Sequence, residues 1–399
     1  MQRGLISQEG ARMAGEVMLE MRKFVAPEFI FGVGSSAMAG QYCRNLGARK
    51  PLVVSMPELL EFDWYKAILS SLDQHGLEYA VFDALSENPR DYEVMRGVDF
   101  YAEQGCDALL AVGGGSVMDC AKGIGIAHSN ACNVLEFEGV DMVGRPGPPL
   151  VCVPTTAGSS ADVSQFAIIN DTTRKVKIAI VSKTVVADTA LIDPAVTVTM
   201  GRELTVNTGL DALTHAIEAY VSNANAPVTD LFALEAVRLV GHHLQAAAAD
   251  GTDIDARAGM MLGSMYAGLA FSNAILGAVH SMAHSLGGFS DLPHGLCNAI
   301  LLDLVVAFNY DHAPQRHEAV AAALAQGRGR TLTPGKDGVL DQLRDFKKAL
   351  GLDKRLGELG VRREDLRTLA EMAMQDPCMV TNPRKPTREE VEALYAQAL

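Results

Sequence analysis

Basic residues are too few in this 399-residue chain to balance its acidic ones. It has 34 Lys and Arg against 48 Asp and Glu, which gives a formal net charge of −14 at pH 7. Neutralising the phosphates of a nucleic acid requires clustered Lys and Arg, and attraction to an anionic membrane surface requires basic segments as well. We therefore expect neither nucleic acid nor a membrane among the partners of this protein.

Closely spaced cysteines and long apolar runs are also missing. The seven cysteines are scattered and include no C-x-x-C pair, which argues against a disulfide scaffold or a structural zinc site and favours a reducing compartment. No uninterrupted apolar stretch approaches the roughly 18 residues that a membrane-spanning helix needs. The N-terminal segment 1–17 (MQRGLISQEGARMAGEV) lacks the apolar core of a signal peptide. The sequence therefore predicts a cytoplasmic protein.

The first half of the chain alternates short apolar runs with helical stretches. This pattern predicts right-handed βαβ units around a parallel sheet that is covered on both faces. The predicted strands are Phe29–Val33, Leu52–Ser55, Tyr79–Phe82, Ala108–Val112, Leu150–Val153 and Val185–Ile192, and the predicted helices are Ser36–Leu46, Leu59–Gln74, Asp91–Glu103 and Val117–Ala127. Two further runs, Ser164–Asn170 and Val176–Val181, predict a hairpin added to that sheet.

Strand signals nearly vanish after about Asp193, where helical periodicity takes over. The predicted helices there are Ala212–Val221, Thr229–Ala248, Ala256–Ser272 and Leu276–Leu286. Thr387 and Glu390, following Pro386, have the spacing of a capping box that opens a final helix. We therefore expect an α/β domain over residues 1–193 and an all-helical domain over residues 194–399, with the ligand site in the cleft between them.

A glycine-rich turn, residues 113–116 (GGGS), follows the predicted strand Ala108–Val112 and leads directly into a helix. Backbone N–H groups at such a helix start can approach a phosphate with no Cβ in the way. Asp119 is expected in the first turn of that helix, where it would cap exposed amides and face a sugar or a pyrophosphate-linked group. The spacing matches neither G-x-G-x-x-G nor the P-loop, and the alternative is an ordinary tight strand–helix turn.

Small hydroxyl residues follow the next strand of the predicted sheet, in the segment 154–160 (PTTAGSS). The carboxyl ends of strands are where open α/β sheets bind their ligands. The alternative is a turn held by local Ser and Thr hydrogen bonds. An earlier glycine turn at residues 32–36 is a weaker signal of the same kind.

Histidines recur at helical spacing in the second half. Asp211 and His215 stand four residues apart, and His280 and His284 repeat this spacing on a later helix. Residues four apart share one face of a helix and can bind one ion. With His294 in the loop sequence LPHG, three imidazoles and one carboxylate would suit Fe²⁺ or Zn²⁺ and leave a position open for a substrate oxygen. The alternative is a pair of solvated helix faces.

With these motifs in this order, the chain resembles the iron-containing (group III) alcohol dehydrogenase family nearly from end to end. The resemblance is carried by GVGSSAMAG, NPRDYEV, AVGGGSVMDCAKGIGI, PTTAGSSADVS, TGLDALTHAIEAYVS, GLAFSNAILGAVHSMAHSLGG, LPHGLCNAILL and NPRKPT. It implies a Rossmann-like domain that binds a nicotinamide dinucleotide over residues 1–193, and an all-α domain that binds metal and substrate over residues 194–399. It also implies a homodimer or a larger homo-oligomer.

The resemblance assigns roles to individual positions. The implied metal ligands are Asp211, His215, His280 and His294, and His284 matches a nearby histidine that takes part in proton exchange. The implied cofactor contacts are Gly114, Gly115, Ser116 and Asp119 at the pyrophosphate, Thr155, Thr156 and Ser159 around the nicotinamide-side phosphate and ribose, Lys177 at a ribose, and Asn88 near the adenosine half. Phe271 matches an aromatic residue on the substrate side, and Phe166 on the predicted hairpin adds a second apolar side chain. Without the resemblance, Lys177, Asn88 and Phe271 would be an exposed strand residue, a turn residue and a core residue.

Two positions depart from the family pattern. Members that prefer NAD end their second strand in Thr-Asp, whose acid binds the ribose 2′-hydroxyl, whereas this chain has Met56 there, followed by Pro57 and Glu58. Loss of the carboxylate removes its repulsion of a 2′-phosphate, but no basic residue stands beside Met56 to bind one. The sequence therefore predicts NAD, with NADP as the alternative. Asp162 replaces the family's usual Glu with a shorter side chain.

Together these residues predict a metal-dependent oxidoreductase that transfers a hydride between a small primary alcohol, or its aldehyde, and NAD(P). Fe²⁺ is the predicted metal and Zn²⁺ the alternative, acting as a Lewis acid that lowers the pKa of the alcohol. The proton would leave through His284 or a cofactor ribose hydroxyl, and the apolar Phe271 and Phe166 would favour small aliphatic alcohols over polyols. The alternatives are a glycerol or diol dehydrogenase of the same fold and a regulatory sensor that retains the fold with weak activity.

Overall fold

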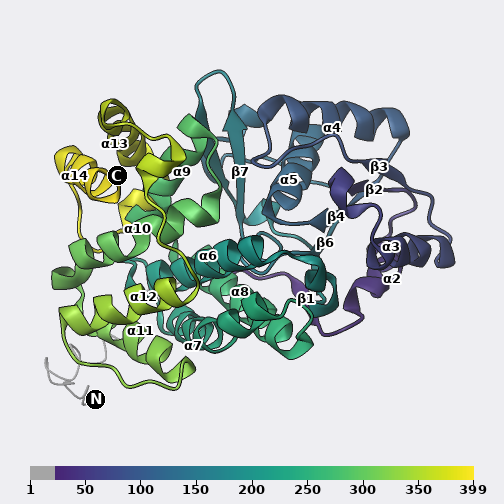
Figure 1. Ribbon diagram of the computed structural model, residues 1–399. Helices are drawn as coiled ribbons and strands as arrows, with labels where there is room; N and C mark the ends of the chain where they lie inside the picture. Colours follow the sequence, from purple (N-terminus) through teal and green to yellow (C-terminus); the bar gives the residue numbers. More distant parts are fainter. Residues whose placement is uncertain (1–22) are drawn as a thin grey trace, which may run out of the picture.

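The computed structural model describes residues 23–399, so the N-terminal segment 1–17 considered above lies outside the described residues. Over the described range, six strands form one parallel sheet in the order β1-β9-β6-β4-β2-β3. Their bounds are β1 (Glu28–Phe31), β2 (Pro51–Val54), β3 (Ala80–Phe82), β4 (Ala108–Gly113), β6 (Leu150–Pro154) and β9 (Thr189–Ile192). The sheet and its helices form the right-hand side of the molecule in Figure 1, and the predicted parallel α/β fold is confirmed.

Helices cover both faces of this sheet because alternate strand side chains point to opposite sides. On β2, Leu52 and Val54 pack into one apolar cluster, which also holds side chains of α4 and α5. Val53 packs into a second cluster on the other face, with side chains of α2 and α3. The helices are α2 (Ala39–Asn45), α3 (Asp63–Gln74), α4 (Asp91–Gln104) and α5 (Gly115–Asn130). Burial on both faces explains why β2, β4 and β6 are continuous apolar runs rather than alternating ones.

The helix predicted from Ser36 begins at Ala39, because a 3-10 turn covers Ser35–Met38. Two other predicted boundaries are displaced by short 3-10 turns as well. The helix predicted from Leu59 begins at Asp63, because Pro57 starts a 3-10 turn over residues 57–59. The strand predicted from Val185 begins at Thr189, because a 3-10 turn at residues 183–185 precedes it, capped by the Ser182 hydroxyl. None of these shifts changes the topology.

The chain reverses its direction of travel across the sheet between β2 and β4. From β2 the chain continues to β3 on one side, whereas from β4 it continues to β6 on the other. Such a topological switch point is where open α/β sheets bind ligands, outside the carboxyl ends of the strands. The glycine turn follows β4 and Met56 follows β2, so both lie at this point.

Strands β7 (Phe166–Asp171) and β8 (Val176–Val181) form the predicted antiparallel hairpin, but its predicted addition to the parallel sheet is wrong. In the described part of the chain, the hairpin joins the short β5 (Gly139–Val140) in a separate three-stranded sheet. The edge beside β6 is already occupied by β9, and the inward apolar side chains of the hairpin share a core cluster with α5. The buried Lys122 of α5 donates from Nζ to two backbone oxygens at the start of the hairpin, at 2.7 and 2.8 Å.

The second half is helical, as predicted, and fills the left-hand side of Figure 1. Its helices are α6 (Arg202–Val221), α7 (Pro227–Ala249), α8 (Ile254–Ala274), α9 (Ala278–Ser290), α10 (His294–Asn309), α11 (Pro314–Gly327), α12 (Lys336–Ala349), α13 (Leu366–Gln375) and α14 (Arg388–Ala398). The predicted capping box opens α14: Thr387 Oγ1 accepts from the N–H of Glu390 at 3.2 Å, and Glu390 Oε2 accepts from the N–H of Thr387 at 2.8 Å. Within residues 23–399 no single helix is long and apolar enough to cross a membrane, although α8 and α9 meet that test as a pair bent by 100°.

Polar bridges join the two halves beside the glycine turn. Asp291, just after α9, accepts from Asn88 Nδ2 at 2.9 Å and pairs with Arg90 at 3.2 Å. Lys177 on β8 donates from Nζ to Asn88 Oδ1 at 2.7 Å. The loop before α4, the hairpin and the end of α9 therefore meet beside the glycine turn.

Candidate metal centre and nucleotide cleft

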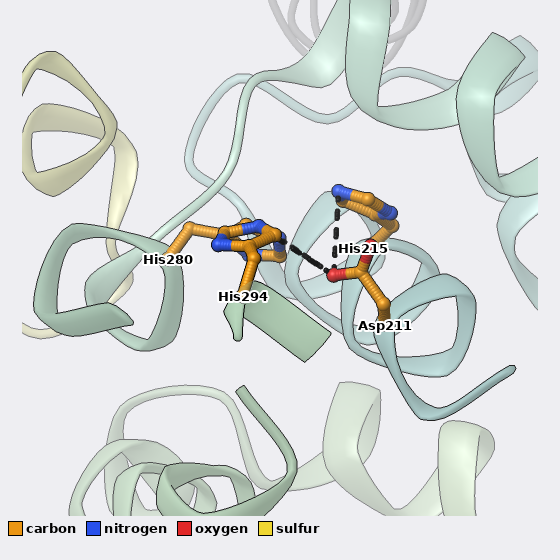
Figure 2. A group of neighbouring side chains, drawn as sticks. All are labelled: Asp211, His215, His280 and His294. Carbon is orange, nitrogen blue, oxygen red and sulfur yellow. Dashed lines mark ion pairs between the residues drawn. The ribbon is translucent and has the colours of Figure 1, made fainter. Parts of the chain in front are cut away.

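The structure brings the four predicted metal ligands together. Asp211 and His215 lie one turn apart on α6, His280 lies in the first turn of α9, and His294 opens α10 (Figure 2). One donor atom from each lies within 4.8 Å of the others. Asp211 Oδ1 is 3.6 Å from Nε2 of both His280 and His294 and 4.0 Å from Nε2 of His215. The spacing D-x-x-x-H therefore places its two side chains on the inner face of a buried helix rather than on a solvated one.

Burial and mutual charge set the protonation of this group. Burial opposes the charged form of His215 and lowers its pKa to about 3, and burial likewise holds the pKa of His294 well below its usual value. Burial would raise the pKa of Asp211, but His215, His294 and His280 together hold it far below the usual value. Asp211 is therefore a carboxylate that faces the lone pairs of two neutral imidazoles, His215 and His294, the protonation state that metal ligands require.

His280 behaves differently because it stands between two carboxylates. Burial opposes its protonation, but hydrogen bonds and charges from Asp211 and Glu218 raise its pKa to about 9. Its Nδ1 lies 2.6 Å from Glu218 Oε2, which fixes the proton on Nδ1 and turns Nε2 toward Asp211. Metal-binding histidines commonly donate their second ring N–H to a carboxylate, and Glu218 is in the position to accept it from His280.

The side chain of Asn298 tests whether these residues fit a metal ion. Its Nδ2 lies 2.7 Å from Asp211 Oδ1, 3.1 Å from His280 Nε2 and 3.2 Å from His294 Nε2. An amide has two N–H hydrogens, so it cannot satisfy three convergent acceptors, and Asn298 Oδ1 has no partner among the described residues. A buried cluster with more lone pairs than hydrogens suits a cation, and one oxygen with three imidazole nitrogens suits Fe²⁺ or Zn²⁺.

His284 lies beside the four-residue group but is not part of it. Its ring stacks on that of His294 with centroids 5.2 Å apart. Its Nδ1 lies 2.8 Å from Asp376 Oδ2, and His284 forms a second cluster with Asp376 and Cys378. His284 is thus grouped apart from the four predicted ligands, and its part in proton exchange stays a prediction.

The two phenylalanines expected on the substrate side form an apolar wall next to the metal group. The ring of Phe271, on α8, stacks on that of His215 with centroids 4.3 Å apart and planes 18° apart. The ring of Phe166, on β7, lies 5.7 Å from that of Phe271. Both side chains are almost fully buried, so they limit the space and the water beside His215.

The glycine turn meets the segment 154–160 face to face. A Cβ on Gly114 would lie 3.2 Å from Thr156, and a Cβ on Gly115 would lie 2.7 Å from Ser159 Oγ. No side chain caps the start of α5, so its first N–H groups are available to a ligand. Thr155 is anchored through its N–H to the backbone oxygen of Gly113 at 3.0 Å. The predicted contacts on the two turns therefore line one site.

The expected capping role of Asp119 is wrong, because Asp119 lies beyond the first turn of α5. Burial raises its pKa to about 7, although Lys122, the backbone N–H of Ile168 and Lys177 act in the opposite direction. Asp119 thus connects α5 to the hairpin. The neighbouring Asp162 is also buried, which raises its pKa to about 6.

Asn88, Ser116 and Lys177 are the remaining predicted cofactor contacts, and they are neighbours. Ser116 Oγ accepts from the N–H of Asn88 at 3.3 Å, and Lys177 donates to the Asn88 side chain. Burial lowers the pKa of Lys177. These residues join the glycine turn to the hairpin, and the charge of Lys177 acts on both Asp119 and His294, so the hairpin lies between the glycine turn and the metal group.

Glu218, Asn298 and Asp376 were missed by the sequence reasoning. Glu218 lies seven residues after Asp211, two turns along the same helix face, so its spacing was a usable signal. Asn298 lies four residues after His294 and offered the same signal. Asp376 is 92 residues from His284 in the sequence, and no local sequence pattern predicts their contact.

Comparisons with known proteins agree with this arrangement. The family model described as iron-containing alcohol dehydrogenase matches residues 26–194, and that of the C-terminal part of the Fe-containing alcohol dehydrogenase family matches residues 205–399. An NAD-dependent methanol dehydrogenase from Bacillus methanolicus is 35% identical over 94% of this chain and 99% of its own length. A 1,3-propanediol dehydrogenase from Klebsiella pneumoniae is 36% identical over 92% and 96%. The crystal structure of a 1,3-propanediol oxidoreductase aligns with a TM-score of 0.91 at 36% identity, over 95% of this chain and 100% of that one.

Proposed function

The chain belongs to the iron-containing alcohol dehydrogenase family, and from this premise we propose that it interconverts a small primary alcohol and its aldehyde with iron and NAD. The observation that carries the proposal is the convergence of one donor atom each from Asp211, His215, His280 and His294. One carboxylate and three imidazoles would occupy four positions on the metal, and a further position would accept the substrate oxygen.

Asp211, His215, His280 and His294 would hold the iron. When bound, the metal supplies a Lewis acid that lowers the pKa of the alcohol hydroxyl, and the nicotinamide supplies an acceptor for hydride. His284, whose ring stacks on that of His294, would take the hydroxyl proton. Phe271 excludes water beside the reacting carbon, because its ring covers His215.

The rest of the chain would hold the dinucleotide. The uncapped start of α5 with Gly114, Gly115 and Ser116 would bind the pyrophosphate through backbone N–H groups. Residues around it would contact the phosphates and riboses; they are Asn88, Asp119, Thr155, Thr156, Ser159 and Lys177. Lys177 supplies positive charge in a chain whose net charge is −14.

NAD rather than NADP is the proposed cofactor. The Bacillus methanolicus relative is named as NAD-dependent, and no basic residue stands beside Met56 to bind a 2′-phosphate. Steady-state rates with NAD and NADP, measured side by side at saturating alcohol, test this choice. A higher kcat/KM with NADP would overturn it.

A diol substrate is the second candidate, because relatives that match nearly the whole chain are named 1,3-propanediol dehydrogenases.

The apolar wall of Phe166 and Phe271 favours a short substrate with few hydroxyl groups. Purified anaerobic protein should therefore oxidise methanol, ethanol, propanol and 1,3-propanediol faster than glycerol. If iron-loaded protein turned over none of these, the sensor alternative would replace the enzyme.

Three further expectations remain proposals. The domain division at residues 193 and 194 falls between the last strand and α6, next to the join of the two family matches. The seven cysteines are all free, as in a reducing compartment such as the cytoplasm. A homodimer or larger homo-oligomer is expected from the family resemblance, and light scattering on purified protein would measure it.

A further inference from the structure

A carboxylate from the C-terminal region lies behind the predicted proton acceptor. Asp376 precedes a 3-10 turn, η9 (Pro377–Thr381), that packs against α9. Its side chain is 7% exposed, as is that of His284. Since neither a buried carboxylate nor a buried imidazole is stable without partners, the hydrogen bonds of this pair decide what each group can do.

The two oxygens of Asp376 have separate partners. Oδ1 accepts from the N–H of Cys378 at 2.8 Å and from the Ser281 hydroxyl at 3.3 Å. Oδ2 faces His284 Nδ1 at 2.8 Å. The turn and α9 therefore fix the direction in which the carboxylate points before any substrate arrives.

An ionised carboxylate can only accept hydrogen bonds. The backbone N–H of Cys378 and the hydroxyl of Ser281 both point at Oδ1, so Asp376 is held as a carboxylate whose Oδ2 faces His284. His284 must then carry its proton on Nδ1, which leaves Nε2 as the nitrogen with a free lone pair. The ring lies against His294 and near His280, with centroids 5.2 and 6.0 Å away, so the imidazole borders the metal group.

We propose that Asp376 is a positioning residue that holds His284 with its proton on Nδ1, so that Nε2 accepts the hydroxyl proton of the alcohol. The inference rests on the proposed function, in which His284 takes that proton. In the oxidation direction the O–H bond breaks, its proton passes to Nε2, and the resulting imidazolium keeps its Nδ1–H bond to Asp376. In aldehyde reduction Nε2 returns the proton.

A second metal site is the competing interpretation of the same three residues, since one donor atom each from His284, Asp376 and Cys378 lie within 4.8 Å. A metal-binding cysteine is a thiolate, whereas burial raises the pKa of Cys378 well above its usual value. Both oxygens of Asp376 already accept hydrogen bonds from protein donors. The cluster therefore has the chemistry of a hydrogen-bonded dyad.

The test is the variant Asp376→Asn, with Asp353→Asn, at an exposed position, as its matched control. Asparagine has one oxygen, and if that oxygen keeps the N–H of Cys378, its NH₂ group faces Nδ1 and forces the proton onto Nε2. We expect kcat to fall about 10²-fold or more, the range attributed to a positioned proton acceptor, while iron content and the KM for NAD remain unchanged. Asp353→Asn makes the same chemical change away from His284, so its kcat should stay close to that of the wild type.

Nitrogen-15 NMR of histidine-labelled protein reads the tautomer directly, in metal-free and in diamagnetic zinc-loaded samples. His284, assigned by its absence in His284→Gln, should show a protonated Nδ1 in the wild type and a protonated Nε2 in Asp376→Asn. A protonated Nε2 in the wild type would overturn the proposal even if the variant failed to fold. Unchanged kcat in a folded Asp376→Asn variant, or loss of a second bound metal from it, would overturn it as well.

The outcome is distinguishable from failure of the proposed function. If wild-type protein oxidised no alcohol but showed the Nδ1-protonated tautomer, the proposed reaction would be refuted. The Asp376–His284 hydrogen bond would still be supported. If the protein were active and the tautomer were reversed, the reaction would stand and the role of Asp376 would fall.

Discussion

The two ends of the proposed active site are built from different parts of the chain. At the metal end, side chains would bind the ligand. Three helices contribute four donor atoms, and Glu218 and Asn298 form hydrogen bonds with His280 and Asp211. At the nucleotide end, backbone N–H groups would bind the ligand. Helix α5 begins without a capping side chain, and the glycines leave space that a Cβ would fill. Side-chain sites should fail abruptly when one atom is lost, and backbone sites gradually as atoms are added.

The largest effect is expected at the metal end. His280→Ala removes one metal-binding nitrogen and leaves the carboxylates of Asp211 and Glu218 without their shared partner. Bound iron should therefore be lost, and kcat/KM should fall about 10³-fold or more. Iron analysis and alcohol oxidation on the same anaerobic sample measure both. His312→Ala removes an exposed histidine of the helical half and should change neither. Full activity in iron-free His280→Ala would contradict the mechanism.

The next largest effect is expected at Glu218, which contacts the metal-binding His280. Glu218→Gln keeps the size of the side chain but removes the charge that orients His280, so iron affinity should fall about 10- to 100-fold. Competition with a chelator measures the affinity, and Glu203→Gln, exposed at the start of the same helix, is the control. Unchanged affinity would mean that the inner residues alone hold the metal.

The nucleotide end should respond in proportion to crowding. Gly115→Ala places a methyl group 2.7 Å from Ser159 Oγ, whereas Gly114→Ala places one 3.2 Å from Thr156. We expect the Kd for NAD to rise roughly tenfold for Gly115→Ala, about 1.4 kcal/mol, and less for Gly114→Ala, with iron content unchanged in both. Titration calorimetry orders the two variants. The reverse order, or loss of iron, would break the contrast between the two ends.

The smallest effect concerns stability as a function of pH. The pKa of Asp119 is raised to about 7 in the folded protein, above the ordinary value, so between about pH 4 and 7 the unfolded chain ionises while the folded one stays neutral. Stability is therefore lost as pH rises through this window. Asp119→Asn should raise the free energy of unfolding at pH 8 by about 1–2 kcal/mol and change it little at pH 4.

Urea unfolding at both pH values measures this difference. Asp99→Asn, at an exposed position of α4, should shift neither curve. A stabilisation of Asp119→Asn that was equal at pH 4 and pH 8 would show that the carboxyl is not neutral in the fold.

The contrast between the two ends also explains what the sequence could predict. Metal ligands on helices are visible as D-x-x-x-H because periodicity places them on one face, and strand–helix alternation predicts the parallel sheet. The pairing partner of the hairpin was not predictable, because its apolar faces suit either sheet and only the packing of β9 and α5 decides. Asp376 was not predictable either, since a contact over 92 residues depends on how η9 packs against α9.

Anomalous X-ray diffraction at the iron edge, on crystals of anaerobically purified and active protein, tests the central claim most directly. The account predicts one strong peak per chain, about 2.0–2.3 Å from a carboxylate oxygen of Asp211 and from Nε2 of His215, His280 and His294. A peak at another place, or active crystals with no metal at these four residues, would contradict it.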